Sequence, residues 1–167
     1  SFYLNNEKVN EVDVLIGGGG IAGSSLFKEM VLRGHNTVLV DYGKGSSYRN
    51  IAAGRSIFSI PELSDIAENN FRIFKEMSKS YDIDFHVINY VSFAENEEVL
   101  AELSKSLQWT RGEVIDKKDF KSRISEYFDG NNRYVGALIT PDCWQATPGK
   151  VINVLRNIGV EGGGEVM

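Results

Sequence analysis

The segment from Gly17 to Gly23 constrains the fold more than any other part of this sequence, because five of its seven residues are glycine. Gly18, Gly20 and Gly23 match the pattern G-x-G-x-x-G. In a dinucleotide-binding turn the first glycine makes the tight turn, the second lets the backbone approach a pyrophosphate, and the third lets a helix pack closely on a strand. The pattern alone is weak evidence, so its meaning depends on the flanking segments.

The flanking segments predict a βαβ unit. Residues 12–17 are a short apolar run rich in β-branched side chains, which is typical of a buried parallel strand. Residues 21–33 carry apolar side chains at helical spacing, and Gly34 followed by His35 predicts the end of this helix. Residues 37–41 predict a second buried strand.

An acidic residue, Asp41, ends the second strand 18 residues after Gly23. An acid at about this distance holds the ribose hydroxyls of a bound dinucleotide. The combination of strand, turn, helix and acid therefore favours nucleotide binding over a flexible glycine-rich turn without a ligand. An acid rather than a basic residue at position 41 disfavours a 2′-phosphate, so NADP is the ligand that we expect least.

The middle of the chain predicts further helices and strands. Residues 42–59 are rich in Gly, Ser and Ala without periodicity, and a loop of this length is unusual unless it has a function. Apolar spacing then predicts a helix over residues 61–80, a strand over 85–93, a helix over 99–107, a helix over 120–128 that includes Tyr127, and a strand over 134–140 that Pro141 ends.

The last residues predict a helix and a strand. Thr147 and Pro148 are typical of the N-cap and first position of a helix, which we expect to end at Gly159. A strand is expected from Val160 onward, but Gly162–Gly164 interrupt it, and the sequence gives no physical reason for these glycines.

Composition excludes several classes of protein. With 18 basic and 23 acidic residues the net charge is −5, so nonspecific binding to nucleic acid is not expected. Cys143 is the only cysteine, which excludes an internal disulfide and a cysteine-rich metal site, and only two histidines, His35 and His86, are present. No apolar run approaches the ~20 residues of a membrane span, and residues 1–10 lack a signal-peptide core. A cytoplasmic protein is the expectation.

Three segments together resemble a known family. These are the turn from Gly18 to Gly23 with Asp41, the segment Gly45–Gly54, and residues 136–142 followed by 147–151. In this combination the chain resembles, from Val12 to Val166, the FAD-dependent amino-acid oxidoreductases, the family of D-amino-acid oxidase, glycine oxidase, sarcosine oxidase and dye-linked proline dehydrogenase. Gly17 and the run Gly162–Gly164 depart from the apolar residues that this pattern favours.

The resemblance implies an α/β fold: a Rossmann-like FAD-binding βαβ unit with part of an α+β substrate domain, in a chain that is incomplete. It implies an FAD-binding part with the flavin loop and following helix over residues 1–83, a partial substrate or cap region over 84–140, and a return to the FAD-binding domain over 141–167. The cofactor is FAD. The residues expected to bind it are Gly18, Gly20, Ile21, Ala22, Gly23, Asp41, Ser46, Ser47, Arg49 and Asn50.

The reaction that the resemblance implies is hydride transfer from the CH–NH group of a small amino acid or secondary amine to flavin. No catalytic residue is assigned, and neither a metal nor nucleic acid is expected as a ligand. Arg49 or Arg55 is a candidate for placing positive charge near flavin or pyrophosphate. An oligomer or a missing C-terminal portion is compatible with the sequence. The alternatives are a non-catalytic nucleotide-binding fragment or subunit of a larger complex, and an NAD-dependent dehydrogenase.

Overall fold

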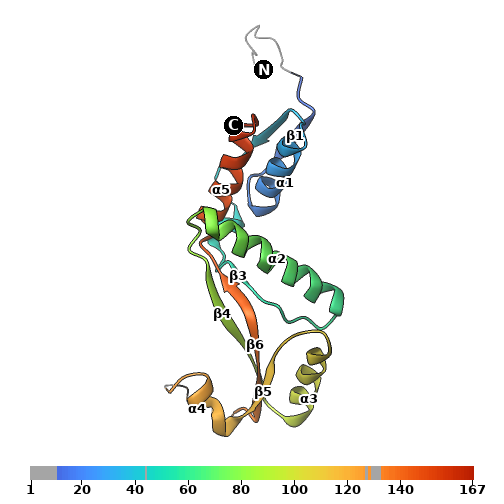
Figure 1. The fold of residues 1–167 in the computed structure, drawn as a ribbon, viewed down its shortest axis with the longest axis vertical. Coiled ribbons are helices and arrows are strands. Elements are labelled where there is room, and N and C mark those ends of the chain that lie inside the picture. Colours follow the sequence, from blue (N-terminus) through green and yellow to red (C-terminus); the bar gives the residue numbers. More distant parts are fainter. Residues whose placement is uncertain (1–10, 44, 127, 129–132) are drawn as a thin grey trace. The chain divides into compact units, whose positions relative to one another are not determined.

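The computed structural model describes residues 11–43, 45–126, 128 and 133–167. They form two compact units, one of residues up to Asn50 with residues 147–167, and one of residues 51–146 (Figure 1). These boundaries differ from those expected at residues 83/84 and 140/141, because residues 51–83 pack with the second unit and residues 141–145 continue its longest strand. Whether residues 51–83 serve the cofactor stays a prediction.

The first unit is a parallel sheet with two helices. Its elements are β1 (Val14–Gly17), α1 (Ile21–Leu32), β2 (Thr37–Val40), a short 3₁₀ helix (Ser46–Arg49), α5 (Pro148–Glu161) and β7 (Glu165–Val166). The strand order is β1-β2-β7, with Val14 opposite Thr37 and Val38 opposite Glu165. The core contains Phe27 and Leu39, both fully buried, packed with Ile16 and Val31. The predicted βαβ unit is therefore present with bounds within two residues of those expected.

The glycines near the end of the chain have a packing role that the sequence did not reveal. α5 continues two residues past Gly159, and Gly162–Gly164 precede β7 instead of interrupting it, so both expectations for this segment were wrong. A Cβ on Gly159 or on Gly164 would lie 2.6 Å from a ring atom of Phe27. Gly163 has φ +100°, which glycine adopts without strain. Small residues are needed here because Phe27 fills the space.

The second unit is built on an antiparallel sheet with β6 in its centre (Figure 1). β6 (Gly136–Gln145) pairs with β3 (Ala53–Gly54), β4 (His86–Ala94) and β5 (Glu113–Asp116). The helices are α2 (Pro61–Ser80), α3 (Glu97–Lys105) and α4 (Phe120–Arg123). On α2, Phe74 stacks on Trp144 of β6 with ring centroids 4.2 Å apart, so this tryptophan is part of the packing of the unit.

Two expectations for this unit were wrong. Pro141 lies inside β6 and does not end it, because the strand is irregular there: the register shifts between Ile88 and Tyr90, and Asp142 has φ +58°. An irregular position tolerates a residue without an N–H group. The helix expected over residues 120–128 is only the four residues of α4, and Tyr127 lies outside the described residues.

The apolar side chains that suggested a longer helix pack in a cluster instead. Phe120 and Phe128 both pack on Phe93, with centroid distances of 5.6 and 4.7 Å. Within the part of the chain that the structure describes, no helix combines the length and the apolar composition needed to cross a bilayer.

Candidate functional site

The glycine-rich turn joins β1 to α1 in a backbone conformation that two of its glycines make accessible. Gly18 has φ +97°, and its N–H donates to the carbonyl oxygen of Val40 at 2.8 Å. A Cβ on Gly23 would lie 3.0 Å from the carbonyl carbon of Gly18 and nearer still to its oxygen. α1 thus starts in direct contact with the turn, and any side chain at position 23 would push the two apart.

The N-cap residue of α1 contributes no side chain to the N-terminus of the helix. Gly20 is the N-cap residue, so it has no side chain that accepts a hydrogen bond, and the first turn of α1 contains no acidic residue. Ile21 and Ala22 are exposed there. The first N–H groups of a helix have no partner within it and carry a partial positive charge. This end of α1 can therefore receive an anionic group.

The loop after β2 brings one serine to this helix end. The Ser47 hydroxyl accepts a hydrogen bond from the Ile21 N–H at 3.2 Å, and a Cβ on Gly20 would lie 2.7 Å from the same oxygen. Asn50 supports the loop by donating from Nδ2 to the carbonyl oxygen of Ser47 at 3.1 Å. Ser46 and Arg49 are exposed on the same short helix.

Asp41 lies beside the turn, and its side chain is only 7% exposed. A backbone hydrogen bond from Gly19 is the largest cause that lowers the pKa of the Asp41 carboxyl, and the Arg156 guanidinium and the backbone of Gly43 lower it further, against the opposing effect of burial. The carboxylate is therefore ionised at neutral pH and held in a fixed orientation at the edge of the turn.

Arg156 is the site residue that the sequence interpretation missed. It lies on α5 and donates to the Asp41 carboxylate, to the carbonyl oxygen of Gly19, and from Nε to the Ser24 hydroxyl at 3.2 Å. A signal was present: Arg156 follows Ile152 by four residues and precedes Gly159 by three, which places it beside the apolar face of the helix. A charged residue in such a position needs a partner.

All ten residues expected to bind the cofactor belong to the first unit. The structure places the glycines, Ile21 and Ala22 at the start of α1, Ser47 against that start, and Asp41 at the end of β2. Hydrogen-bond donors for an anion thus lie next to an acceptor for hydroxyl groups. Such an arrangement can bind a molecule that carries a diphosphate beside a ribose.

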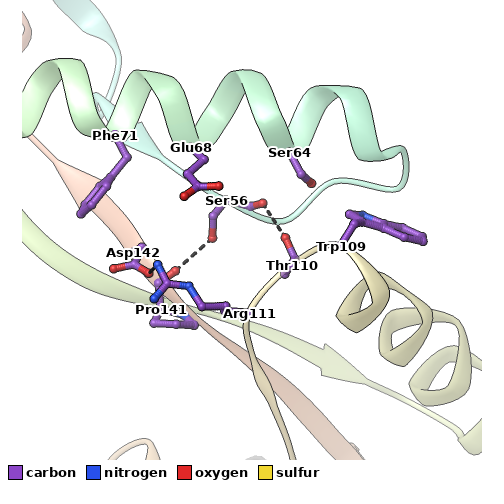
Figure 2. A pocket seen from close by; sticks show the side chains of 9 residues that line it. All are labelled: Ser56, Ser64, Glu68, Phe71, Trp109, Thr110, Arg111, Pro141 and Asp142. Atoms are coloured by element: carbon purple, nitrogen blue, oxygen red, sulfur yellow. Dashed lines mark hydrogen bonds and ion pairs between the residues drawn. The ribbon is translucent and has the colours of Figure 1, made fainter.

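The second unit contains a small cavity of about 80 Å³ between α2 and the β6 strand (Figure 2). Figure 2 shows that Ser56 links its walls, donating from Oγ to the carbonyl oxygen of Pro141 at 3.0 Å and accepting at its own carbonyl oxygen from Thr110 at 2.9 Å. Arg111 and Asp142 form an ion pair at its edge. The Ser64 hydroxyl is buried without a partner among the described residues, so a cavity of this size suits ordered water.

A larger pocket of about 300 Å³ lies elsewhere in the second unit. It is lined by apolar and hydroxyl side chains and by three charged residues, Arg55, Glu102 and Lys105. Lys105 forms an ion pair with Glu102. Arg55 has no carboxylate partner among the described residues, and its guanidinium lies over the ring of Phe58, 4.7 Å from the centroid. This pocket therefore offers a cation to a small anionic ligand.

Cys143 and the two histidines are the remaining candidate residues. Cys143 is fully buried, 3.6 Å from the Ser56 hydroxyl oxygen, while His35 and His86 are exposed. No group of three or more potential metal ligands occurs within residues 11–43, 45–126, 128 and 133–167.

Comparison with known proteins gives one family match and several similar folds. A family model described as FAD dependent oxidoreductase matches residues 13–167. The search of curated proteins found no match. Among solved structures, L-proline dehydrogenase from P. horikoshii superposes with a TM-score of 0.84 at 18% identity, and glycine oxidase from Geobacillus kaustophilus with 0.79 at 16%. L-α-glycerophosphate oxidase from Mycoplasma pneumoniae, solved with FAD bound, has a TM-score of 0.79 at 15% identity.

These structures share the fold with the chain over nearly its whole length. The superpositions cover 94%, 93% and 93% of this chain, but only 44%, 46% and 44% of the proline dehydrogenase, the glycine oxidase and the glycerophosphate oxidase. The chain therefore spans less than half the length of each of these proteins.

Proposed function

Because this chain belongs to the family of FAD-dependent oxidoreductases, we propose that its first unit binds the adenosine diphosphate half of FAD at the glycine-rich turn. Family membership confirms the resemblance drawn from the sequence, the α/β fold class and FAD as the cofactor. The single observation that carries the proposed site is the start of α1, where N-cap Gly20 has no side chain and the Ile21 N–H donates to Ser47, with ionised Asp41 beside it.

The residues present fit the diphosphate of FAD. Gly20 offers no side chain at the point where α1 begins, and its Cβ position is limited by the Ser47 hydroxyl. The N–H groups of Ile21 and Ala22 are at the exposed helix start, where the dipole favours negative charge. We assign the binding of the phosphate oxygens to the Ala22 N–H and to the Ser47 hydroxyl, whose oxygen the Ile21 N–H holds at the helix start.

The ribose of the adenosine half is assigned to Asp41. An ionised carboxylate accepts hydrogen bonds only, which matches the two donors of a ribose diol. Gly18 and Gly23 act indirectly, since they keep the backbone of the turn against α1. Ser46, Arg49 and Asn50 remain proposed contacts of the cofactor beyond the adenosine half.

The substrate that we propose is a small amino acid or secondary amine. FAD supplies the acceptance of a hydride from the carbon that bears the nitrogen, after which the imine product hydrolyses. Support comes from the similarity to a proline dehydrogenase and a glycine oxidase and from the Arg55-lined pocket, whose cation suits a substrate carboxylate. A site of about 300 Å³ is at the lower end for small-molecule pockets, which suits a small substrate.

The test uses the full-length protein with its flavin removed and then added back. We expect wild type to bind FAD, and Gly20→Val to lose binding because its side chain would occupy the approach to the diphosphate. Gly17→Val is the matched control, because no atom lies within 4 Å of a Cβ at Gly17. Stoichiometric flavin retained by Gly20→Val contradicts the proposed site.

The substrate class is tested by adding candidate substrates to the flavin-loaded protein without oxygen. Reduction of the bound flavin is followed as the loss of its absorbance at about 450 nm. Bleaching by proline or glycine supports amine oxidation, whereas bleaching by glycerol 3-phosphate alone assigns the chain to alcohol oxidation. A protein that binds NAD and no flavin would instead be a nicotinamide-dependent dehydrogenase, and one that binds flavin but reacts with no donor would be a non-catalytic nucleotide-binding subunit. The cytoplasmic location expected from the single cysteine and the oligomeric state stay predictions.

A further inference from the structure

Arg156 joins α5 to the glycine-rich turn through three polar groups. Its guanidinium contacts the Asp41 carboxylate, the Gly19 carbonyl oxygen and the Ser24 hydroxyl, and it lies 6.0 Å from the ring centroid of Tyr48. The Arg156 side chain is 18% exposed and that of Asp41 is 7% exposed. A pair so little exposed to water is screened weakly, so each charge strongly affects the electrostatic potential of the turn.

The position of Asp41 creates an electrostatic conflict for a diphosphate. The carboxylate is at the edge of the turn, next to the helix start where the phosphates would lie. An uncompensated negative charge there would repel a group that itself carries negative charge. Arg156 removes this conflict, because the pair of Asp41 and Arg156 has no net charge.

The pair also leaves room for the ribose. A carboxylate offers about four acceptor positions. Arg156 donates to one oxygen of the Asp41 carboxylate, Oδ2, so acceptor positions remain for a ribose hydroxyl. Neutralising Asp41 therefore does not prevent it from acting as the ribose acceptor.

We propose that Arg156 is a positioning residue for FAD: it fixes the Asp41 carboxylate against Gly19 and cancels its charge, so that one turn accepts both ribose and diphosphate. This inference rests on the proposed binding of FAD at the turn. A purely structural role, in which Arg156 only holds α5 to the turn through Gly19 and Ser24, makes a different prediction. It would affect a neutral ligand and a charged ligand equally.

The experiment measures dissociation constants of the flavin-free full-length protein for FAD, ADP and adenosine by calorimetry. ADP and adenosine share the ribose but differ in the diphosphate, so the ratio of their dissociation constants reports the charge at the turn. Arg156→Met leaves Asp41 uncompensated, and we expect ADP and FAD to bind about tenfold or more weakly, with adenosine affected less than about threefold. Arg156→Lys keeps the charge, and ADP binding should stay within about threefold of wild type.

Two further variants test the charge directly. Asp41→Asn leaves Arg156 uncompensated and should increase the preference for ADP over adenosine. The double variant, with both Asp41→Asn and Arg156→Met, should restore the preference of the wild-type protein. The Asp41→Asn prediction also holds if Arg156→Met does not fold. Arg33→Met is the matched control, because it removes an exposed arginine at the far end of α1, about 18 Å from the turn, and should change no constant.

The outcomes separate the two proposals. If wild type binds FAD but Arg156→Met binds ADP with unchanged affinity, or weakens ADP and adenosine equally, the role of Arg156 is overturned while the proposed FAD site stands. An unchanged preference for ADP in Asp41→Asn overturns it as well. If wild type binds neither FAD nor ADP, the proposed site itself fails, and the role of Arg156 fails with it.

Discussion

Replacing Gly23 by alanine tests whether the contact between α1 and the turn determines the stability of the first unit. Gly23 is the third residue of α1. An added Cβ would lie 3.0 Å from the Gly18 carbonyl carbon and closer to its oxygen, whereas ordinary contacts begin at 3.4 Å. The carbon contact alone requires a movement of about 0.4 Å, and the closer oxygen requires a larger one. The group that has to move is backbone, held by the hydrogen bond from the Gly18 N–H to Val40.

Two effects of opposite sign determine the magnitude. Overpacking of this kind costs about 1–3 kcal/mol. Alanine gains up to about 1 kcal/mol over glycine as a helix former, which offsets part of the cost. Because the overlap is with backbone, we take the upper end of the overpacking cost and expect a net loss of about 2 kcal/mol in the free energy of unfolding, or about 4–8 °C in Tm for a chain of this size. FAD binding should weaken as well, because the displaced turn carries the proposed diphosphate contacts.

The measurement is urea unfolding of the flavin-free protein, followed by titration of FAD into the folded variant. Gly17→Ala is the matched control, since its new Cβ would have no atom within 4 Å, and its free energy of unfolding should stay within about 0.5 kcal/mol of wild type. If Gly23→Ala unfolds at the same urea concentration as Gly17→Ala, the contact is not as tight as we describe and the reasoning is refuted.

Three further predictions concern Asp41, Arg55 and Gly159. Because the pKa of Asp41 is lowered in the fold, its ionised form stabilises the protein above the unfolded pKa of about 4, and this contribution disappears as the pH falls through the lower folded pKa. Urea unfolding between pH 7 and pH 3 should therefore show a larger acid loss for wild type than for Asp41→Asn; parallel curves would contradict this. Arg55→Met should raise the KM for an amino-acid substrate about tenfold with little change in kcat. The control Arg72→Met, at an exposed arginine, should change neither constant. An unaltered KM in Arg55→Met excludes Arg55 from carboxylate binding. Gly159→Ala should destabilise the protein by about 1–3 kcal/mol in thermal unfolding, despite its position in a helix, because its Cβ would lie 2.6 Å from Cδ1 of Phe27 and closer still to Cε1; a stabilised variant would show that this space is open.

Local sequence patterns predicted the elements that are set by local interactions. The helix expected over residues 61–80 has these bounds in the structure, and the helix expected over 21–33 ends one residue earlier. In both cases the signals are local: the spacing of apolar residues within the helix, and a residue at its boundary, Pro61 at the start of one helix and Gly34 just after the other. The strand expected over 85–93 is displaced by one residue, to 86–94.

The patterns failed where residues distant in sequence determine the structure. Phe120 and Phe128 have the spacing of one helical face, but they pack around Phe93 from another element, and the helix ends at Arg123. Pro141 lies within a strand because the pairing of β6 with β4 is irregular there. Neither arrangement has a signal in the local sequence.

The sequence alone determined the βαβ unit, the position of the glycine turn and the acid at the end of β2, because strand and helix periodicity, glycine spacing and turn chemistry act over a few residues. The tertiary structure decided which side chains meet at that turn. It brought Ser47 to the start of α1, and it brought Arg156 across more than a hundred residues to Asp41. The physical reason is that a charge is stabilised inside a fold by whichever partner packing places beside it, and packing depends on the whole chain.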